Sequence, residues 1–578
     1  MHVGVDVGTG SVRAAVFDIR GHSLSSASLP ISTHTPLAEH YEQASDEIWQ
    51  QCCNAVRQCL SAIEQRSQFV TSGENTVRNQ VESIAFDATC SLVVLDGSDR
   101  PVSVTPTGVA RRSVWNVILW MDHRAVAQAD RINSTNHPVL GFVGGKVSPE
   151  MEWPKVLWLK EHLPQSFGSA CGGKLMDLTD YLTYRATGVD ERSQCTVTCK
   201  WNWIAPEAAS LLPQSSEPYT DGWTASFLQE IGVAEFVSDA EKARAVKGQS
   251  GVGVRPLAAP VGNGLSAKAA SELGLRQGCA VGVGLIDAHA GGIGLLSLRS
   301  PAPSPSSFPS RLAMVSGTST CYMFTSDDAV KVPGVWGPYY GAMLPDKWLL
   351  EAGQSATGSF IDHLLVSHAA RYDPPLADKP LHDVHRHLAH ILMQHEGEDC
   401  PTVLTKDIHM TPDVHGNRSP FADPHKRGVV VGASLERSVN HLAVMYLAAL
   451  QAVAYGCRHI MQTVESKGHP HIETICLCGG LAKSPLFAQQ CADILQRDVL
   501  IAPEETDAVL LGSAIIGAAA LEGGGSDALL SAMQRMGPLA SLVRPTSKPS
   551  IVDLHDRKYG VFVRMMEFEK ECRDAMHS

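Results

Sequence analysis

The sequence predicts an α/β protein whose two halves share one architecture. In each half, two apolar strands flank a short turn of glycine and hydroxyl residues, over residues 3–17 and 312–324. Apolar runs of strand length also alternate with segments of helical periodicity in both halves, which is typical of α/β proteins. The repeated strand, turn and strand indicates an internal duplication.

The first half begins as a strand meander. Alternating valines over residues 3–7 predict a strand, and apolar residues resume after the first glycine turn. A second pair of strands is expected at residues 84–86 and 92–95, on either side of a polar cluster. A further strand is expected at residues 280–286, where it runs into Asp287.

The second half follows a segment rich in proline and serine, which predicts a flexible insertion or linker. Helical spacing of apolar residues over 442–453 predicts a long helix, and residues 472–478 predict a buried strand. Small residues over 512–520 predict a closely packed late helix. The expected parts of the chain are an N-terminal domain (1–299), the linker (300–310) and a C-terminal domain (311–578).

Composition excludes several classes of partner. The 578 residues carry a formal net charge of -13, and such a chain repels nucleic acid and anionic lipid, so neither is expected as a partner. No run predicts a membrane span, and residues 1–6 lack the features of a signal peptide. The 15 scattered cysteines are expected to be small buried residues. We therefore expect a cytoplasmic protein.

The first glycine turn carries the strongest chemical signal. Asp6 ends a strand and is followed by Gly8, Thr9, Gly10 and Ser11. Glycines let the backbone approach a ligand, and successive N–H groups form an anion-binding nest to which the hydroxyls add donors. A carboxylate beside a phosphate site suits a magnesium ion held between them, often through water. An ordinary hairpin turn would use the same residues, so this motif alone leaves both interpretations open.

Two later turns favour the phosphate-binding interpretation. Residues 316–320 form a second turn of the same kind, and two such turns could hold a polyphosphate from both sides. Residues 479–485 follow a strand and precede a helix, where backbone amides and the helix dipole suit a nucleotide.

These three turns resemble the first phosphate, second phosphate and adenosine motifs of the actin-like ATPase superfamily. Within it, the chain resembles the FGGY carbohydrate kinases, and most closely their ribulokinase-type branch, from residue 3 to about residue 520. The resemblance implies two ribonuclease-H-like domains with an active-site cleft between them, and ATP and Mg²⁺ as cofactors. It marks as ATP-binding the residues Gly8, Thr9, Gly10, Ser11, Gly317, Thr318, Ser319, Gly358, Gly480 and Ser484.

The resemblance also assigns two acidic residues. Asp287 matches the family's catalytic aspartate, which would accept the proton of the sugar hydroxyl while that oxygen attacks the γ-phosphorus. Asp6 matches the acid that holds magnesium, usually through water. Without the resemblance, Asp287 would be interpreted as a helix N-cap, for which aspartate is well suited.

A substrate site is implied in the same way. Lys200 and Glu351 match the sugar-contacting pair of the ribulokinases, and such a pair can hold neighbouring hydroxyls as donor and acceptor. Taken alone, both would be surface charges. Thr89 and Cys90 match the substrate-lining turn of the first domain.

Two further segments match the family less specifically. In residues 120–124, Trp120 suits packing on the sugar and a place in the core equally well. Residues 413–420 resemble a ribulokinase-type loop near the cleft, without an assigned role.

Several motif-like segments are set aside. Residues 168–175 almost spell a P-loop but lack its final serine or threonine and a preceding strand, and residues 282–284 are too short for a dinucleotide fingerprint. Cys476 and Cys478 are expected on one face of a strand, with metal binding as the less favoured alternative. Four histidines suit a solvated helix face at least as well as a metal site: His382, His385, His387 and His390.

These residues predict an ATP- and Mg²⁺-dependent kinase acting on a ketopentose or pentitol. D-ribulose, giving D-ribulose 5-phosphate, is the first choice, and ribitol, L-ribulose and xylulose are the alternatives. An actin- or chaperone-like ATPase, or an inactive sensor, would share the ATP motifs without needing Asp287, Lys200 and Glu351. The expected partner is a small sugar or polyol, and a homodimer is one assembly that the sequence allows.

Overall fold

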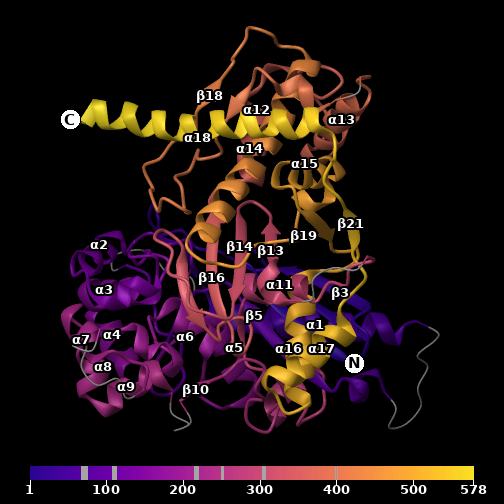
Figure 1. Ribbon diagram of the computed structural model, residues 1–578. Helices are drawn as coiled ribbons and strands as arrows, with labels where there is room; N and C mark the ends of the chain where they lie inside the picture. The colour runs from indigo at the N-terminus through magenta and orange to yellow at the C-terminus, as the bar shows by residue number, and fades with distance from the viewer. Residues whose placement is uncertain are drawn as a thin grey trace.

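The computed structural model describes residues 1–66, 76–106, 114–213, 221–248, 253–302, 307–397, 399 and 401–577. The chain forms two lobes, each built around a twisted sheet with helices on its faces (Figure 1). The expected α/β class is confirmed. The boundary of the domains at residues 299 and 311 stays a prediction, and the middle of the linker (303–306) lies outside the described residues.

The first sheet has the order β11-β5-β1-β2-β3, with β12 also pairing with β5. Its strands are β1 (His2–Val7), β2 (Ser11–Phe17), β3 (Ser23–Pro30), β5 (Ser83–Ala88), β11 (Ala280–Val281) and β12 (Leu285–Ile286). β1 is antiparallel to β2 and parallel to β5. Every residue of β1 and β5 is buried, because a sheet covered on both faces leaves no strand position for solvent. The predicted meander is confirmed.

The second sheet has the order β15-β16-β14-β13-β19-β20-β21. Its strands are β13 (Arg311–Ser316), β14 (Thr320–Ser326), β15 (Trp336–Tyr340), β16 (Trp348–Gln354), β19 (Thr474–Cys478), β20 (Asp498–Ile501) and β21 (Ser541–Val543). The five strands β16-β14-β13-β19-β20 repeat the order of the first sheet, and β13 is likewise antiparallel to β14 and parallel to β19. This confirms the shared architecture of the two halves.

Two helices lie between the sheets and pack against each other: α11 (Asp287–Leu296) and α16 (Ala508–Leu521). α11 contacts β13 and β19 of the second sheet, whereas α16 contacts β1 and β5 of the first. Gly512 explains their close approach, because a Cβ there would lie 1.8 Å from the Ala290 carbonyl oxygen. The closely packed late helix is confirmed, and each half of the sequence covers the sheet of the other.

The outer faces of the two sheets carry separate helices. On the first sheet lie α1 (Ser45–Glu64), α5 (Leu178–Thr187) and α10 (Ala267–Leu273). On the second lie α12 (Gly358–Ser367), α13 (Leu381–Met393), α14 (Val439–Ser466) and α15 (Pro485–Leu495). The long helix predicted around residues 442–453 is thus α14.

α14 is apolar and long enough to cross a membrane by length and composition, contrary to the expectation that no run is. However, 72% of its most apolar window is buried inside the protein, against α12, α13 and α15. It is a core helix of the second lobe, and its composition follows from that burial.

A smaller sheet stands beside the first, with the order β4-β7-β6-β8. Its strands are β4 (Glu42–Gln43), β6 (Leu92–Leu95), β7 (Val117–Ile118) and β8 (Lys174–Asp177). Helices nearby are α2 (Val126–Ser134), α3 (Glu152–His162), α4 (Pro164–Cys171), α6 (Gln194–Lys200), α7 (Ala225–Glu230), α8 (Glu235–Ser238) and α9 (Ala240–Lys247). Two short pairs, β9 (Arg192–Ser193) with β10 (Val254–Arg255) and β17 (His409–Met410) with β18 (Val430–Val431), complete the strands.

Two strand predictions were wrong. β5 and β6 do not pair, because the chain leaves the first sheet after Ala88 and enters the smaller one. The strand expected at 280–286 is interrupted at Gly282, where a Cβ would lie 2.8 Å from the Ile516 side chain. The P-loop look-alike was rightly set aside, because helix α4 precedes strand β8 there, which reverses the order of a P-loop.

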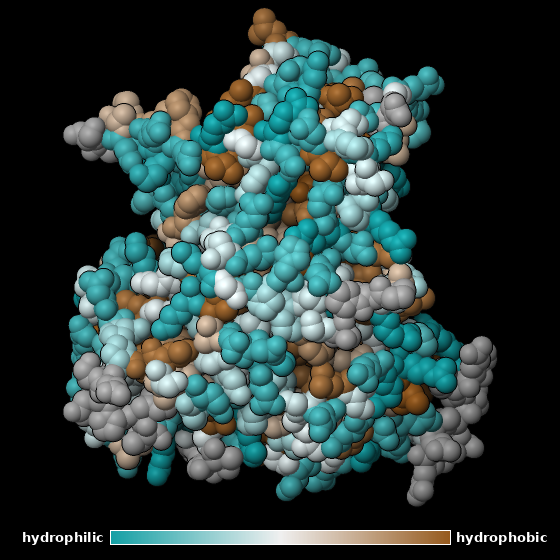
Figure 2. Space-filling view, in the orientation of Figure 1, coloured by the Kyte–Doolittle hydropathy of each residue, from teal (hydrophilic) through white to brown (hydrophobic). Residues whose placement is uncertain are grey.

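The chain ends in two helices, α17 (Gly525–Met536) and α18 (Pro549–His577). α18 crosses the second lobe, and its last turns project from the body (Figure 1). Lys426 and Glu569 form a salt bridge at 3.2 Å that ties this helix to the loop before β18. Hydrophilic residues cover most of the face in Figure 2, with hydrophobic residues in scattered groups.

Candidate active site

Three carboxylates stand at the same end of three neighbouring strands. Asp6 and Asp87 are direct neighbours across the parallel strands β1 and β5. Asp287 follows β12, whose last residues pair with the end of β5, and it begins α11. The carboxyl ends of parallel strands are where α/β folds place their ligands. The site therefore forms at the base of the first sheet, where α11 and α16 meet it.

The first two carboxylates form a coupled pair. Asp6 and Asp87 are both buried, and burial followed by the charge of Asp6 raises the pKa of Asp87 well above its usual value. Ser513 of α16 donates to Oδ2 of Asp87, whereas Oδ1 has no donor within the described part of the chain. Burial also raises the pKa of Asp6, although the charge of Arg13 opposes this effect, so a cation bound here would favour the ionised form of both carboxyls.

Asp287 is the third carboxylate, and its pKa is also raised. Burial and then the negative charge of Asp6 raise its pKa to about 6. Oδ1 accepts one hydrogen bond, from the Ala288 amide at 2.7 Å. Asp287 is the first residue of α11, and the N-cap of this helix is Ile286, so the N-cap interpretation of Asp287 is wrong. A carboxylate whose pKa lies near 6 is a base close to neutral pH.

Arg13 links the two lobes at this site. Its Nε donates to Oδ2 of Asp6 at 2.6 Å, and its guanidinium also forms a salt bridge with Asp507. Asp507 caps α16 by accepting from the amides of Val509 and Leu510. Because the first strand pair supplies Arg13 and the second half supplies Asp507, this ion pair holds the two halves together beside Asp6.

The first phosphate turn joins β1 to β2 and is partly open to solvent. The Gly8 amide closes the turn on the Ser11 carbonyl at 3.0 Å. Trp120 Nε1 donates to Thr9 Oγ1 at 3.0 Å, so this tryptophan fixes the turn. Gln43 Nε2 donates to the Thr9 carbonyl at 2.8 Å. Trp120 and Gln43 therefore fix the turn by hydrogen bonds to Thr9, while Gly10 remains exposed to solvent.

The second phosphate turn joins β13 to β14 and is held by the start of α12. The Thr357 amide donates to the Thr318 carbonyl at 3.0 Å, and the Gly358 amide donates to the Gly317 carbonyl at 3.1 Å. A Cβ on Gly358 would lie 2.6 Å from that same carbonyl, so the contact requires glycine. Gly317 and Thr318 are exposed, while Ser319 is half-buried.

The third turn follows β19. Gly479 has φ +95, and a Cβ there would lie 2.2 Å from the Ser316 carbonyl oxygen, so the turn abuts the second phosphate turn. Gly480 is exposed, with open space where its Cβ would be. Ser484 caps α15, because its Oγ accepts from the Phe487 amide at 3.3 Å. The two glycine turns of the second lobe are thus adjacent, which is what a single nucleotide requires.

Lys200 and Glu351 come from different lobes and meet at Trp336. Glu351 and Trp336 are directly opposite each other on β16 and β15, so their side chains share one face. Lys200 ends α6, and its Nζ lies 4.5 Å from the centroid of the Trp336 ring. Both charged side chains are buried, although the sequence alone suggests surface charges. The predicted pair is thus brought together.

The charges of this pair are stable at neutral pH. Burial favours the neutral form of Lys200, but the neighbouring Cys90 and Glu351 outweigh it and raise its pKa well above the usual value. Burial would raise the pKa of Glu351, but Lys200, His289 and Arg418 hold it below the usual value. Oε2 of Glu351 is buried without a hydrogen-bond partner in the described residues. An unsatisfied buried acceptor beside a lysine suits a hydroxyl ligand.

Thr89 and Cys90 lie next to this pair. Both are buried after β5, and the Thr89 amide donates to the Val7 carbonyl at 3.0 Å. The charge of Lys200 acts on the Cys90 thiol, which places that thiol near the lysine. The substrate-lining turn therefore lies between the carboxylates of the first sheet and Lys200.

Four residues of the site carry no assigned role from the sequence alone: Asp87, Arg13, Trp336 and Arg418. Arg418 lies in the segment 413–420, and its guanidinium is 5.7 Å from the Trp336 ring centroid. Asp87 had a signal, because it ends a buried strand as Asp6 does. Arg13 ends the first glycine motif and Arg418 lies in the family-like loop, whereas no local pattern marks Trp336.

The set-aside metal sites remain unsupported. Cys476 and Cys478 both lie buried on β19, as expected, and the Arg311 guanidinium donates to Cys476 at 3.3 Å. The histidines of α13 follow the expected helix face, and His385 bonds to Asp362 at 2.9 Å. Within the described residues, neither set forms a group of three converging metal ligands.

The chain thus combines two duplicated α/β lobes, three glycine turns and a row of carboxylates at the strand ends of the first sheet, and these are features that phosphoryl transfer uses. Residues 1–201 match the N-terminal domain of the FGGY family of carbohydrate kinases, and residues 312–521 match its C-terminal domain. The chain belongs to this family, and it is a carbohydrate kinase.

Named relatives support membership of the same family. The chain is 42% identical over 585 residues to the FGGY carbohydrate kinase domain-containing protein of Danio rerio, covering 100% of this chain and 99% of that protein. The human protein of the same name is 41% identical over 581 residues, with 100% and 98% covered. A D-ribulokinase of Saccharomyces cerevisiae is 36% identical over 545 residues, which covers 90% of this chain and 72% of that enzyme.

Solved structures confirm the fold. Xylulose kinase from Rhodospirillum rubrum superimposes with a TM-score of 0.71 at 20% identity, covering 98% of both chains. Glycerol kinase from Plasmodium falciparum with ADP gives 0.72 at 14% identity, covering 98% of this chain and 97% of that one. At these identities the likeness establishes the two-lobed fold, and the predicted fold class is confirmed.

Proposed function

We propose that this protein phosphorylates D-ribulose with ATP and yields D-ribulose 5-phosphate. The main support for this proposal is that Asp287, Lys200 and Glu351 converge at one site between the lobes. The identity to a D-ribulokinase over 90% of this chain favours D-ribulose among the ketopentoses. Ribitol, L-ribulose and xylulose are the competing substrates, because one unpaired hydroxyl can change preference greatly.

ATP would bind across the glycine turns. Gly8, Thr9, Gly10 and Ser11 would surround phosphate from the first lobe, and Gly317, Thr318 and Ser319 from the second. Gly480 lies in open space beside the second turn and leaves room for the nucleoside. The amide of Gly358 already bonds to Gly317, so Gly358 would act by shaping the phosphate turn.

The carboxylates fit a magnesium ion. Mg²⁺ prefers carboxylate and water oxygens, and Asp6 and Asp87 offer adjacent carboxylates with Oδ1 of Asp87 unpaired. Asp6 would hold the ion through water, with Asp87 beside it. When bound, the ion supplies charge neutralisation of the phosphates.

Asp287 would act as the general base. As a carboxylate near its pKa of about 6, it can accept the proton of the sugar hydroxyl as that oxygen attacks the γ-phosphorus. The P–O bond to the ADP leaving group breaks as the new P–O bond forms. Arg13 would keep Asp6 ionised beside this centre, because it already bonds to Oδ2.

Lys200 and Glu351 would hold the sugar. The ammonium can donate to one hydroxyl while Oε2 of Glu351 accepts from another. Because Lys200 lies in the first lobe and Glu351 in the second, a sugar bound to both would favour the closed arrangement of the lobes. Closure excludes water and suppresses wasteful ATP hydrolysis.

A coupled ADP-release assay tests the proposal. Magnesium-ATP is offered with D-ribulose, L-ribulose, xylulose, ribitol, glycerol and no sugar in parallel. The proposal predicts the highest kcat/KM for D-ribulose and little ADP release without sugar. A higher kcat/KM for another pentulose or pentitol would identify that sugar as the substrate instead of D-ribulose. Equal ADP release in every tube would contradict the proposed roles of Asp287, Lys200 and Glu351.

A further inference from the structure

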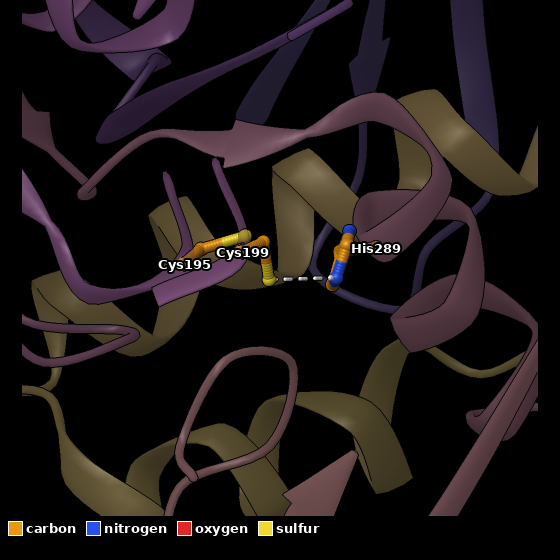
Figure 3. A group of neighbouring side chains, drawn as sticks. All are labelled: Cys195, Cys199 and His289. Atoms are coloured by element: carbon orange, nitrogen blue, oxygen red, sulfur yellow. Dashed lines mark hydrogen bonds between the residues drawn. The ribbon is translucent and has the colours of Figure 1, made fainter. Parts of the chain in front are cut away.

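Three side chains that can bind a metal ion lie next to the proposed sugar site. Cys195 and Cys199 stand one turn apart on α6, and His289 lies in the first turn of α11 (Figure 3). All three side chains are fully buried, and their ligand atoms lie within 4.8 Å of one another. The Sγ of Cys199 is 3.5 Å from Nε2 of His289. Figure 3 shows these side chains pointing toward one another from two helices.

We propose that Cys195, Cys199 and His289 form a zinc-binding site. In a tetrahedral zinc site with Zn–S of about 2.3 Å and Zn–N of about 2.0–2.1 Å, the sulfur and nitrogen are about 3.6 Å apart. The observed 3.5 Å between Cys199 and His289 already matches this edge. The Sγ of Cys195 lies within 4.8 Å of the other two ligand atoms, so a movement of at most about 1 Å brings it to the third position.

The chemistry of the three residues selects the metal. Thiolates and imidazole favour Zn²⁺ over Mg²⁺, which takes oxygen ligands. Two thiolates would balance the charge of the ion, so a neutral complex would occupy this buried place. This site is distinct from the carboxylates that suit magnesium.

The site adjoins the sugar contacts. Cys199 directly precedes Lys200, and His289 follows Asp287 by two residues. The charge of Glu351 acts on the His289 ring, although Glu351 lies outside the group whose ligand atoms are within 4.8 Å of one another, and its Oε2 is unpaired in the described structure. Three protein ligands leave a fourth position on zinc, and Glu351 would reach it by a side-chain movement. Zinc and sugar would then compete for Glu351, a consequence that rests on the proposed function.

Metal binding is measured first, without turnover. The protein carries Cys572→Ser, because Cys572 is an exposed thiol, and it is stripped of metal in a phosphine-reduced buffer. Zinc is titrated against a chromophoric indicator, and Co²⁺ is added to a second sample. We expect one zinc per chain, a sulfur-to-cobalt charge-transfer band and the strong visible bands of tetrahedral cobalt.

Variants then locate the ion. Cys195→Ser should weaken zinc binding by more than about 100-fold, because a ligand lost costs at least as much as an outer-shell partner. Cys171→Ser, at a buried lone cysteine of α4, should bind as the parent does. Absence of the sulfur-to-cobalt band in the parent would overturn the site even where a variant fails to fold. Equal zinc affinity in the folded Cys195→Ser variant would overturn it as well.

Competition with sugar is measured last. At zinc ten times above its Kd, with magnesium-ATP fixed, KM for D-ribulose should rise about 10-fold in the parent and stay unchanged in Cys195→Ser. Zinc binding with an unchanged KM would overturn the competition for Glu351. Failure of the proposed kinase activity would appear as missing turnover without metal, while the cobalt spectrum would still report the site.

Discussion

Replacing Asp287, the proposed general base, by its amide should separate activity from stability. Asp287→Asn keeps the size of the side chain and an oxygen that can accept from the Ala288 amide, so the start of α11 is preserved. The change removes the base and the negative charge beside Asp6. Because loss of a general base typically costs about 10²- to 10⁴-fold in rate, we expect sugar-dependent kcat to fall by that factor. ATP affinity should change little.

The same variant should be more stable than the parent at neutral pH. The pKa of Asp287 is raised from 3.8 to about 6 in the folded state, because burial and Asp6 disfavour the ionised form. The ionised form therefore costs the folded state free energy above pH 6, and that cost vanishes below the unfolded value of 3.8. A pKa shift of this size corresponds to at most about 3 kcal/mol in the free energy of unfolding at pH 7.5. Solvent access to the half-buried side chain reduces this value.

Chemical unfolding at two pH values measures this gain. At pH 5 the gain should fall to about half, because the carboxyl of the folded parent is then mostly protonated. Turnover is followed in the same preparations by coupled ADP release. A variant with normal sugar-dependent turnover would remove the assigned role. A variant equally stable or less stable at pH 7.5 would contradict the raised pKa.

Three further predictions follow from the same site. Lys200→Met should raise KM for the sugar about 10- to 150-fold, because a hydrogen bond to a charged group contributes about 1.5–3 kcal/mol, while an unchanged sugar KM would contradict the contact. Gly358→Ala should raise KM for ATP by displacing the Gly317 carbonyl, as steady-state kinetics with varied ATP would show. The kcat/KM for sugar should fall tenfold per pH unit below the Asp287 pKa of about 6 and level off above it; a flat profile between pH 5 and 7 would rule out this base.

Local patterns in the sequence were sufficient for the strands and turns of each lobe. Alternating valines mark β1, and glycine with hydroxyl residues marks both phosphate turns, because these features depend on neighbouring residues alone. The interruption between β11 and β12 could not be predicted this way. It depends on Gly282 packing against Ile516, which is more than two hundred residues away in the chain.

The candidate site was predictable only where one segment carries a whole motif. Asp6 and Asp287 stand in such segments, and the structure places them beside each other. Trp336 belongs to a segment without a motif, and it contacts Lys200 through the packing of one lobe on the other. Arg418 lies in the family-like segment 413–420, to which no role was assigned, and it contacts Trp336. Asp87 is intermediate, because its strand was predicted but its register with Asp6 is a long-range property.

The proposed function requires phosphoryl transfer to a sugar hydroxyl. Phosphorus NMR of a reaction containing D-ribulose and magnesium-ATP observes this transfer directly. We predict that the ATP signals decline while the signals of ADP and of one new phosphomonoester appear. The phosphorus of this phosphomonoester should show scalar coupling to the C5 protons of the sugar. Inorganic phosphate as the only new signal besides ADP would contradict it.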